Sequence, residues 1–229
     1  MILIIGAGFV FTGCKKVLDI NEDPNNPSVS QATPQLLFPA VQISAASAIG
    51  GELAIIGMLW SEYTTEDVSS SQYRNFDSYN VTSSDLSTDY NQLYTGTLNN
   101  LEIILQQSKA SGDWNYYLMA SVMKAYTYQV LVDLYDQVPY TQALQGAVNL
   151  QPKFDGGDTI YNTMLNILDT ALNQDFGAVT VTNPGGGDYF FWRRYVQMEI
   201  ICLYAQVENV FENGECKTCG SRGRHQSIV

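Results

Sequence analysis

The stretch from Leu93 to Tyr135, LYTGTLNNLEIILQQSKASGDWNYYLMASVMKAYTYQVLVDLY, decides the fold. In its first half, apolar side chains recur at the spacing of one helix face: Leu93, Tyr94, Leu98, Leu101, Ile104 and Leu105. This pattern predicts a helix over 86–109 that ends at Gly112. Asp113 is a suitable N-cap for a second helix over 114–135. Because the connector is so short, the two helices are expected to lie antiparallel and side by side.

Comparable patterns place helices before and after this pair. Residues 35–48 and 52–64 are predicted to form two helices interrupted at Gly50-Gly51, and a further helix over 159–173 is expected to be capped by Asp158. The segment 66–82 loses the apolar period and is expected to be a loop.

The connections complete the expected architecture. Val138-Pro139 stops the second helix of the pair, and residues 183–187 form a Gly-rich loop. No substantial sheet is expected before residue 180. Small side chains at Ala120, Ser121 and Ala125 let neighbouring helices approach closely. The sequence therefore predicts an all-α body of helical hairpins that pack like tetratricopeptide repeats.

Composition limits the classes of function. The 229 residues carry a net charge of −12, with 11 basic and 23 acidic side chains. No basic stripe is available to neutralise phosphates, so the sequence argues against nucleic-acid binding. Charged residues are only 15%, and the 15 Tyr with many Asn, Gln, Ser and Thr must supply the polar surface. Such a surface is typical of extracytoplasmic proteins that handle neutral polar ligands.

The distribution of His and Cys argues against several kinds of active site. Before residue 192 there is no His, and Cys14 is the one Cys. A Ser–His–Asp or Cys–His system and a His-based zinc site are therefore excluded there. No glycine-rich phosphate-binding loop is present either. Together, these observations lead us to predict no catalytic residue, no metal ion and no cofactor. A carboxylate-pair hydrolase stays open, because many acidic side chains are available.

The N-terminus has the features of an export signal. Residues 2–13 form an uncharged apolar run that is too short to span a bilayer but has the length of a signal-peptide core. It ends in Phe11-Thr12-Gly13-Cys14, which resembles a bacterial lipobox. We therefore expect residues 1–13 to be a lipoprotein signal peptide, Cys14 to be lipidated, and 14–34 to be an extended, lipid-anchored tether. The alternative is a buried N-terminal strand with an incidental Cys.

Three segments of the chain resemble the SusD/RagB family, the nutrient-binding surface lipoproteins of Bacteroidetes. The first is Leu18-Asp19-Ile20-Asn21-Glu22-Asp23-Pro24-Asn25-Asn26-Pro27, followed by residues 33–40. The second runs over 120–128 and into Leu131-Val132-Asp133-Leu134-Tyr135-Asp136-Gln137-Val138-Pro139-Tyr140. The third is Pro152-Lys153-Phe154-Asp155 with the helix 160–172.

The resemblance implies a fold, a place and a partner. The fold is the SusD-like set of tetratricopeptide-like helix pairs, here over 35–191. The place is the cell surface of the outer membrane, and the partner is a TonB-dependent transporter for which the lipoprotein binds a glycan or another nutrient. Family members are usually about twice as long, so the domain over 35–191 is expected to be incomplete.

The last 38 residues differ from the rest in composition. Residues 192–229 hold five of the 11 basic residues, three of the four Cys and the only His. Back-translation of 192–222 with a one-base slip permits a family-like string that begins GGDMSKWKLF. We therefore expect the tail to be out of frame, by a natural lesion or a sequencing error. For the same reason we do not interpret Cys216, Cys219 and His225 as a metal site.

The best local cluster of ligand-binding groups surrounds the predicted loop. Aromatic faces stack on sugar rings, and planar polar side chains orient them. The candidate ligand-binding residues are Trp60, Tyr63, Tyr73, Arg74, Asn75, Phe76 and Tyr79. The alternative is that Trp60 and Tyr63 are core residues and that the loop merely packs.

Two functions from different classes follow. The first is a nutrient-binding outer-membrane lipoprotein that is not an enzyme and requires no cofactor. The alternative is a carboxylate-dependent glycoside hydrolase. A chain cut short in this way is also compatible with loss of function.

Overall fold

The computed structural model of this protein describes residues 32–178 and 180–190. The expected signal peptide, Cys14, nearly all of the expected tether and the tail over 192–229 lie outside the described residues, so these expectations stay predictions. The chain divides into two compact units, Met1–Ala32 and Thr33–Val229, and the helices of the described residues belong to the second.

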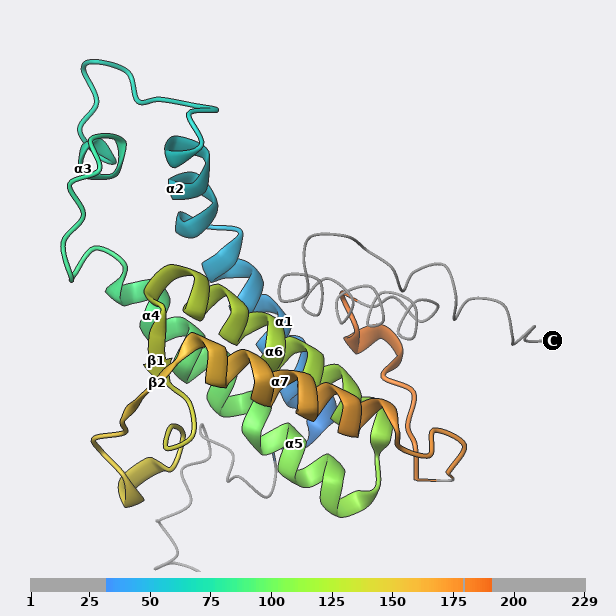
Figure 1. Cartoon of the computed structure of the whole chain (residues 1–229). Coiled ribbons are helices and arrows are strands. Elements are labelled where there is room, and N and C mark those ends of the chain that lie inside the picture. Colours follow the sequence, from blue (N-terminus) through green and yellow to red (C-terminus); the bar gives the residue numbers. More distant parts are fainter. Residues whose placement is uncertain (1–31, 179, 191–229) are drawn as a thin grey trace, which may run out of the picture. The chain divides into compact units, whose positions relative to one another are not determined.

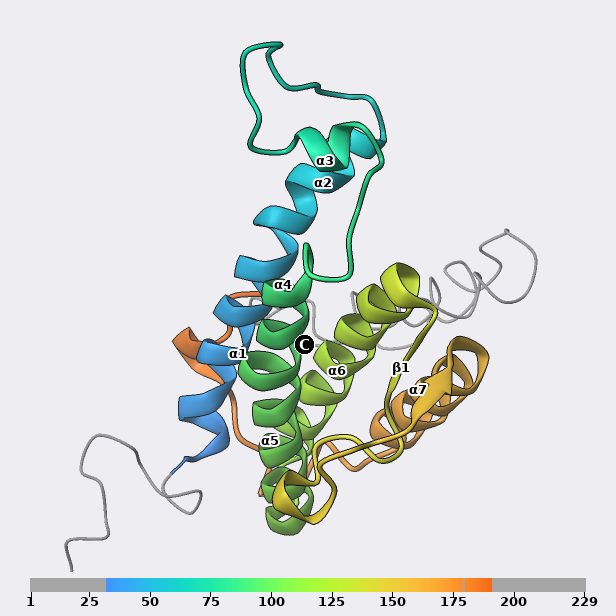
Figure 2. The ribbon, with the colours of Figure 1, turned by 90° about the vertical axis from the view of Figure 1, so that its left-hand side faces the viewer.

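Four helices make up the body: α1 (Pro34–Ile49), α5 (Asn99–Ser111), α6 (Trp114–Tyr135) and α7 (Gly157–Leu172). They pack in that order, with α5 between α1 and α6, and α7 on the other side of α6 (Figure 1, Figure 2). The hairpin predicted from the quoted stretch is confirmed. Its turn is made by Gly112, whose φ of 73° lies in the left-handed region that glycine adopts without steric cost. The expected all-α fold is confirmed.

The hydrophobic core lies between these four helices. Phe38 of α1 and Tyr116 of α6 meet edge to face, with ring centroids 5.8 Å apart, and both are almost fully buried. The small side chains predicted to permit close packing, Ala120, Ser121 and Ala125, are all buried. Because apolar burial is the main favourable term in folding, this core holds the helices together.

Helix α1 continues toward α2 (Glu52–Trp60) after the predicted break. A Cβ on Gly51 would lie 2.3 Å from the carbonyl oxygen of Ser47, so the chain can pass there only as glycine. The second helix was predicted to reach residue 64 but ends at Trp60. The reason is local, because Glu62 takes up a left-handed φ of 58° that an α-helix cannot contain.

The helix predicted over 86–109 is continuous but not uniform. Helix α4 (Ser87–Gln92) leads into a π-helical turn, η2 (Leu93–Leu98), which leads directly into α5. In a π turn the hydrogen bonds span one residue more than in an α-helix. Leu93 and Leu98 are buried in spite of this change. Apolar periodicity therefore predicted the buried face but not the extra residue.

Two short strands join α6 to α7. β1 (Gln137–Pro139) pairs antiparallel with β2 (Phe154–Gly156), and Val138 stands opposite Asp155. The carboxylate of Asp155 accepts hydrogen bonds from the backbone N–H of Tyr140, at 3.1 Å, and of Thr141, at 2.7 Å. Between the strands the chain makes one 3-10 turn, η3 (Gly146–Val148). The prediction of no substantial sheet is consistent with this three-residue pairing.

After α7 the chain returns to the other helices through 180–190, which includes the 3-10 turn η4 (Gly185–Gly187). The Thr180 hydroxyl donates to the carbonyl of Gly112 at 2.9 Å, and the Thr182 N–H donates to the Asp113 carboxylate at 3.1 Å. Asp113 stands at the N-cap of α6, but its side chain makes no capping bond. The predicted N-cap position is therefore confirmed, but the carboxylate bonds to Thr182 and not to the first turn of α6.

The other predicted cap also needs correction. Helix α7 begins at Gly157 with Gly156 at the N-cap position, and Asp158 lies inside the first turn. A carboxylate there still interacts favourably with the helix dipole.

Helices α1 and α2 also present apolar side chains to solvent. Leu36 is 68% exposed, Ile43 59% and Met58 44%. By length and composition alone, Pro34–Trp60 would suffice to cross a membrane, but buried core helices, and signal sequences near an N-terminus, meet the same criterion. Here Phe38 and Val41 on the opposite side of α1 are fully buried in the helical core.

Candidate ligand-binding site

The predicted binding loop leaves the end of α2 and folds back against it. Within this loop, which we call the aromatic loop (residues 60–80), the structure contains a short helix, α3 (Arg74–Asp77), that the sequence did not predict. Figure 2 shows α3 beside the end of α2, and the two helices are in contact. Phe76 of α3 is only 6% exposed and forms a small core with Ile56, Leu59 and Leu86.

Trp60 fastens the aromatic loop to the helix that precedes it. Its indole N–H donates to the carbonyl of Phe76 at 3.0 Å. The ring of Tyr79 stacks on the indole at an interplanar angle of 15°, and the Tyr79 hydroxyl donates to the Trp60 carbonyl at 3.2 Å. Trp60 is half-buried in this arrangement. It therefore holds Tyr79 in a fixed position.

Tyr63 and Tyr79 are the exposed aromatic groups of the loop, at 87% and 62% exposure. Both line a groove of about 400 Å³. Glu62 and Tyr79, two of its lining residues, have left-handed φ values of 58° and 55°. Such conformations cost a non-glycine residue on the order of 1 kcal/mol and tend to collect at binding sites. The groove therefore combines a flat aromatic surface with a backbone held in place by its surroundings.

The other predicted residues shape the loop. The Arg74 guanidinium donates to the carbonyl of Ser70 at 2.6 Å and to that of Val68 at 3.3 Å, which closes the loop on itself. The backbone N–H of Tyr73 donates to the Glu66 carboxylate at 2.6 Å. Asn75 is exposed on α3 but does not line the groove.

The structure thus gathers the predicted residues in one loop and divides them by position. Tyr63 and Tyr79 line the groove. Phe76 belongs to the small core at the end of α2, and Trp60 packs against that core. The alternative of a core role fits Trp60 in part, because its half-buried ring packs against the small core, but it is wrong for Tyr63, which lies beyond the end of α2 in solvent. The part of these residues in ligand binding stays a prediction.

Sequence reasoning missed most of the polar groups of the groove. They are Glu62, Thr64, Thr65 and Asp77. The Thr65 hydroxyl donates to the Asp77 carboxylate at 3.2 Å, which ties the two ends of the loop together. The available signal was the run of polar residues directly after an apolar helix. In the described part of the chain, no three His, Cys, Asp or Glu side chains gather closely enough to hold a metal ion.

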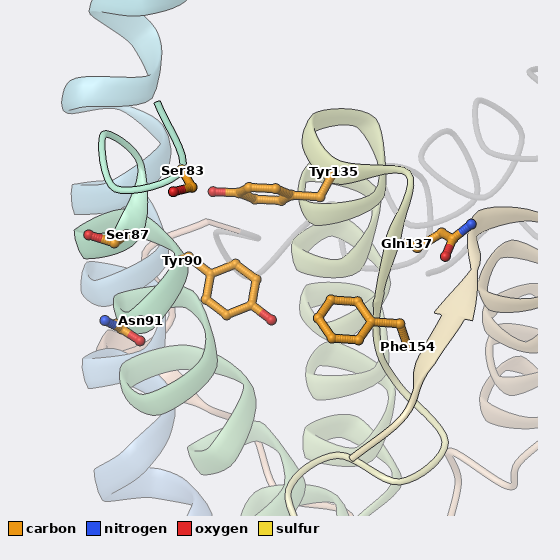
Figure 3. Close-up of a pocket in the computed structure, with 7 residues that line it drawn as sticks. All are labelled: Ser83, Ser87, Tyr90, Asn91, Tyr135, Gln137 and Phe154. Atoms are coloured by element: carbon orange, nitrogen blue, oxygen red, sulfur yellow. The ribbon is translucent and has the colours of Figure 1, made fainter. Parts of the chain in front are cut away.

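A second cavity, which we call the tyrosine pocket, lies between α4, the end of α6 and the strand pair, and the sequence did not point to it. It has a volume of about 300 Å³. Figure 3 shows three aromatic rings around it, those of Tyr90, Tyr135 and Phe154. Its polar lining consists of Ser83, Ser87, Asn91 and Gln137.

Comparison with known proteins agrees with the resemblance in the sequence. The SusD-like family model, described as starch-binding and associating with the outer membrane, matches residues 24–193. No curated protein matches the chain. The family match covers well over half of the 229 residues, including all four body helices. On this ground the chain belongs to the SusD-like family.

Proposed function

We propose that this protein is a lipid-anchored, surface-exposed binding protein of the outer membrane, not an enzyme, that holds a glycan for a TonB-dependent transporter. The observation that carries the proposal is the groove of the aromatic loop, in a chain of a family described as starch-binding and outer-membrane-associated. The transporter is inferred from the family resemblance of the sequence.

The groove suits a neutral sugar. The exposed faces of Tyr63 and Tyr79 offer flat apolar surface to the C–H groups of a pyranose ring. The carboxylates of Glu62 and Asp77 and the hydroxyls of Thr64 and Thr65 can bond the ring hydroxyls. A net charge of −12 disfavours anionic polymers as ligands.

Replacing Tyr79 by alanine is expected to weaken glycan binding about ten- to hundredfold, and Tyr63→Ala by a similar factor. Loss of one stacking face costs roughly 1.4–2.8 kcal/mol of binding free energy. The measurement is isothermal titration with neutral oligosaccharides, starting with α-1,4-linked glucose oligomers. Tyr189→Ala is the matched control, because Tyr189 is 60% exposed but does not line the groove.

The outcome also separates the two classes of function. If Tyr63→Ala and Tyr79→Ala keep wild-type affinity for a ligand that the chain does bind, the groove is not the site. If the chain releases reducing ends from the oligosaccharide, and Asp77→Asn or Glu62→Gln stops the release, the protein is a hydrolase and the proposal of a pure binding function is wrong.

The lipid anchor has its own test. Cys14→Ala is expected to abolish acylation, because the thiol that would carry the diacylglycerol is gone. The measurement is incorporation of a labelled fatty acid in the producing cell, together with detergent-phase partitioning. Cys202→Ala is the control, since the same substitution at Cys202 leaves the lipobox intact. Equal labelling of wild type and Cys14→Ala would show that Cys14 carries no anchor.

A further inference from the structure

We infer that the tyrosine pocket is a second carbohydrate site, which takes one ring of a neutral oligosaccharide. The kind of ligand in this inference rests on the proposed function, but the residues that would bind the ligand are not those of the groove. None of the side chains that line the tyrosine pocket lines the groove of the aromatic loop.

The aromatic walls have the form that sugar stacking requires. Tyr90 and Tyr135 meet nearly at right angles, at 87° with ring centroids 5.3 Å apart, and so make a corner. Phe154 stands across from Tyr90 on β2, with its ring beside the cavity (Figure 3). It is 64% exposed, although an aromatic ring in water forgoes the free energy of burial. A ligand that inserts between Phe154 and Tyr90 would cover both rings.

Contacts within the protein hold the aromatic side chains of the pocket in position. The Tyr135 hydroxyl donates to the carbonyl of Leu86 at 3.4 Å, and Tyr90 also packs against Tyr94, with ring centroids 4.7 Å apart. The strand that carries Phe154 is anchored through its neighbour Asp155 by the hydrogen bonds to the chain beyond β1. A preformed site loses less conformational entropy on binding.

The polar lining indicates a neutral, hydroxyl-rich ligand. Among the described residues, no charged side chain lines the pocket. The side-chain amides of Asn91 and Gln137 are exposed and make no hydrogen bond to any other described residue, so both can donate to and accept from a ligand. Burial raises the pKa of both Tyr90 and Tyr135. Their hydroxyls therefore stay protonated at neutral pH.

The volume of the tyrosine pocket also fits a single sugar ring. A volume of about 300 Å³ stands at the lower end of the range for small-molecule sites, about 300–1,000 Å³. The pocket can hold one sugar ring, with neighbouring rings of the chain in solvent. Two separate sites on one protein increase its hold on a polymer that offers many copies of the same ring.

The test uses Phe154→Ala in the full chain, with α-1,4-glucose oligomers and a panel of other neutral oligosaccharides as probes. Because Phe154 is exposed, this change should leave thermal stability unaltered, which circular dichroism checks. Asn91→Ala is a second variant of the same pocket. Leu150→Ala is the matched control, because Leu150 is 82% exposed in the same connection between β1 and β2 but does not line the pocket.

We expect titration to show two binding events per chain. Phe154→Ala and Asn91→Ala should each weaken one of them at least tenfold, and Tyr79→Ala should weaken the other. If Phe154→Ala and Asn91→Ala leave both affinities unchanged while Tyr79→Ala weakens binding, the tyrosine pocket is no sugar site and the proposed function stands. If the pocket variants lose binding and Tyr79→Ala does not, the groove assignment fails and the pocket stands. Absence of binding by a folded chain across the whole panel overturns both.

Discussion

Replacing Tyr128 by alanine is expected to lower the free energy of unfolding by about 3–5 kcal/mol, as removal of a large buried aromatic ring does. Tyr128 on α6 is 1% exposed. Its ring lies edge to face against Tyr140, with centroids 4.6 Å apart, and against Tyr94, with centroids 6.3 Å apart. The truncation removes both contacts and leaves a cavity between α6, η2 and the chain after β1.

Chemical denaturation followed by circular dichroism measures this loss. For a chain of this size the melting temperature should fall by roughly 6–20 °C. Tyr128→Phe is the control, because it keeps the ring and should cost much less than the alanine change. An alanine variant within about 1 kcal/mol of the wild type would contradict the buried position of this side chain.

Raising the pH above about 10, the ordinary pKa of tyrosine, is expected to lower the free energy of unfolding progressively. The tyrosine core consists of Tyr90, Tyr94, Tyr128, Tyr135 and Tyr140, whose rings contact one another in a chain. Burial is the main cause that raises the pKa of each of them, and neighbouring tyrosines add to it in Tyr94, Tyr128 and Tyr135. For Tyr140 the pKa rises to about 12.

The direction of the effect follows from these shifts. Below about pH 10 the tyrosines are protonated in the folded and the unfolded chain, and the stability they support is fully present. At higher pH the unfolded chain releases protons that the folded chain retains, so stability falls progressively as the pH rises to about 12 and beyond. Guanidinium denaturation at a series of pH values measures this loss, and tyrosinate absorbance reports the titration.

Phenylalanine substitutions provide the control for the alkaline prediction. In the double variant Tyr94→Phe with Tyr128→Phe, two of the titrating hydroxyls are gone while the rings remain. Its stability should therefore fall less steeply with pH than that of the wild type. If both proteins lose stability in parallel, the pH dependence does not arise from the hydroxyls of Tyr94 and Tyr128.

The helices were predictable because each carries its own signal. The apolar stripe from Leu93 to Leu105 is local information, and Gly112 and Gly51 occupy positions where the backbone requires glycine. The strand pair could not be predicted in the same way. It is only three residues long, and the contact between Val138 and Asp155 bridges a connection that has no pattern of its own. The bonding of the Asp113 carboxylate was unpredictable for a related reason, because its partner Thr182 is 69 residues away.

The candidate site was predictable in kind but not in detail. The density of aromatic residues pointed to the aromatic loop, but which rings face solvent depends on how α3 packs on α2. Phe76 turns inward and Tyr79 outward although they are three residues apart. The tyrosine pocket had no local signal at all, since Tyr90, Tyr135 and Phe154 come from three separate segments.

The π turn η2 gives this chain a place where its length can change by one residue at little cost. Deletion of one residue within an α-helix rotates everything beyond it by about 100° and would turn the buried face of α5 into solvent. Within Leu93–Leu98, by contrast, loss of the exposed Thr95 would let the turn close as an ordinary α-helix, with α4 and α5 keeping their faces. Natural variants that are one residue shorter in this segment are thus compatible with the same core, whereas equal deletions in α5 or α6 are not.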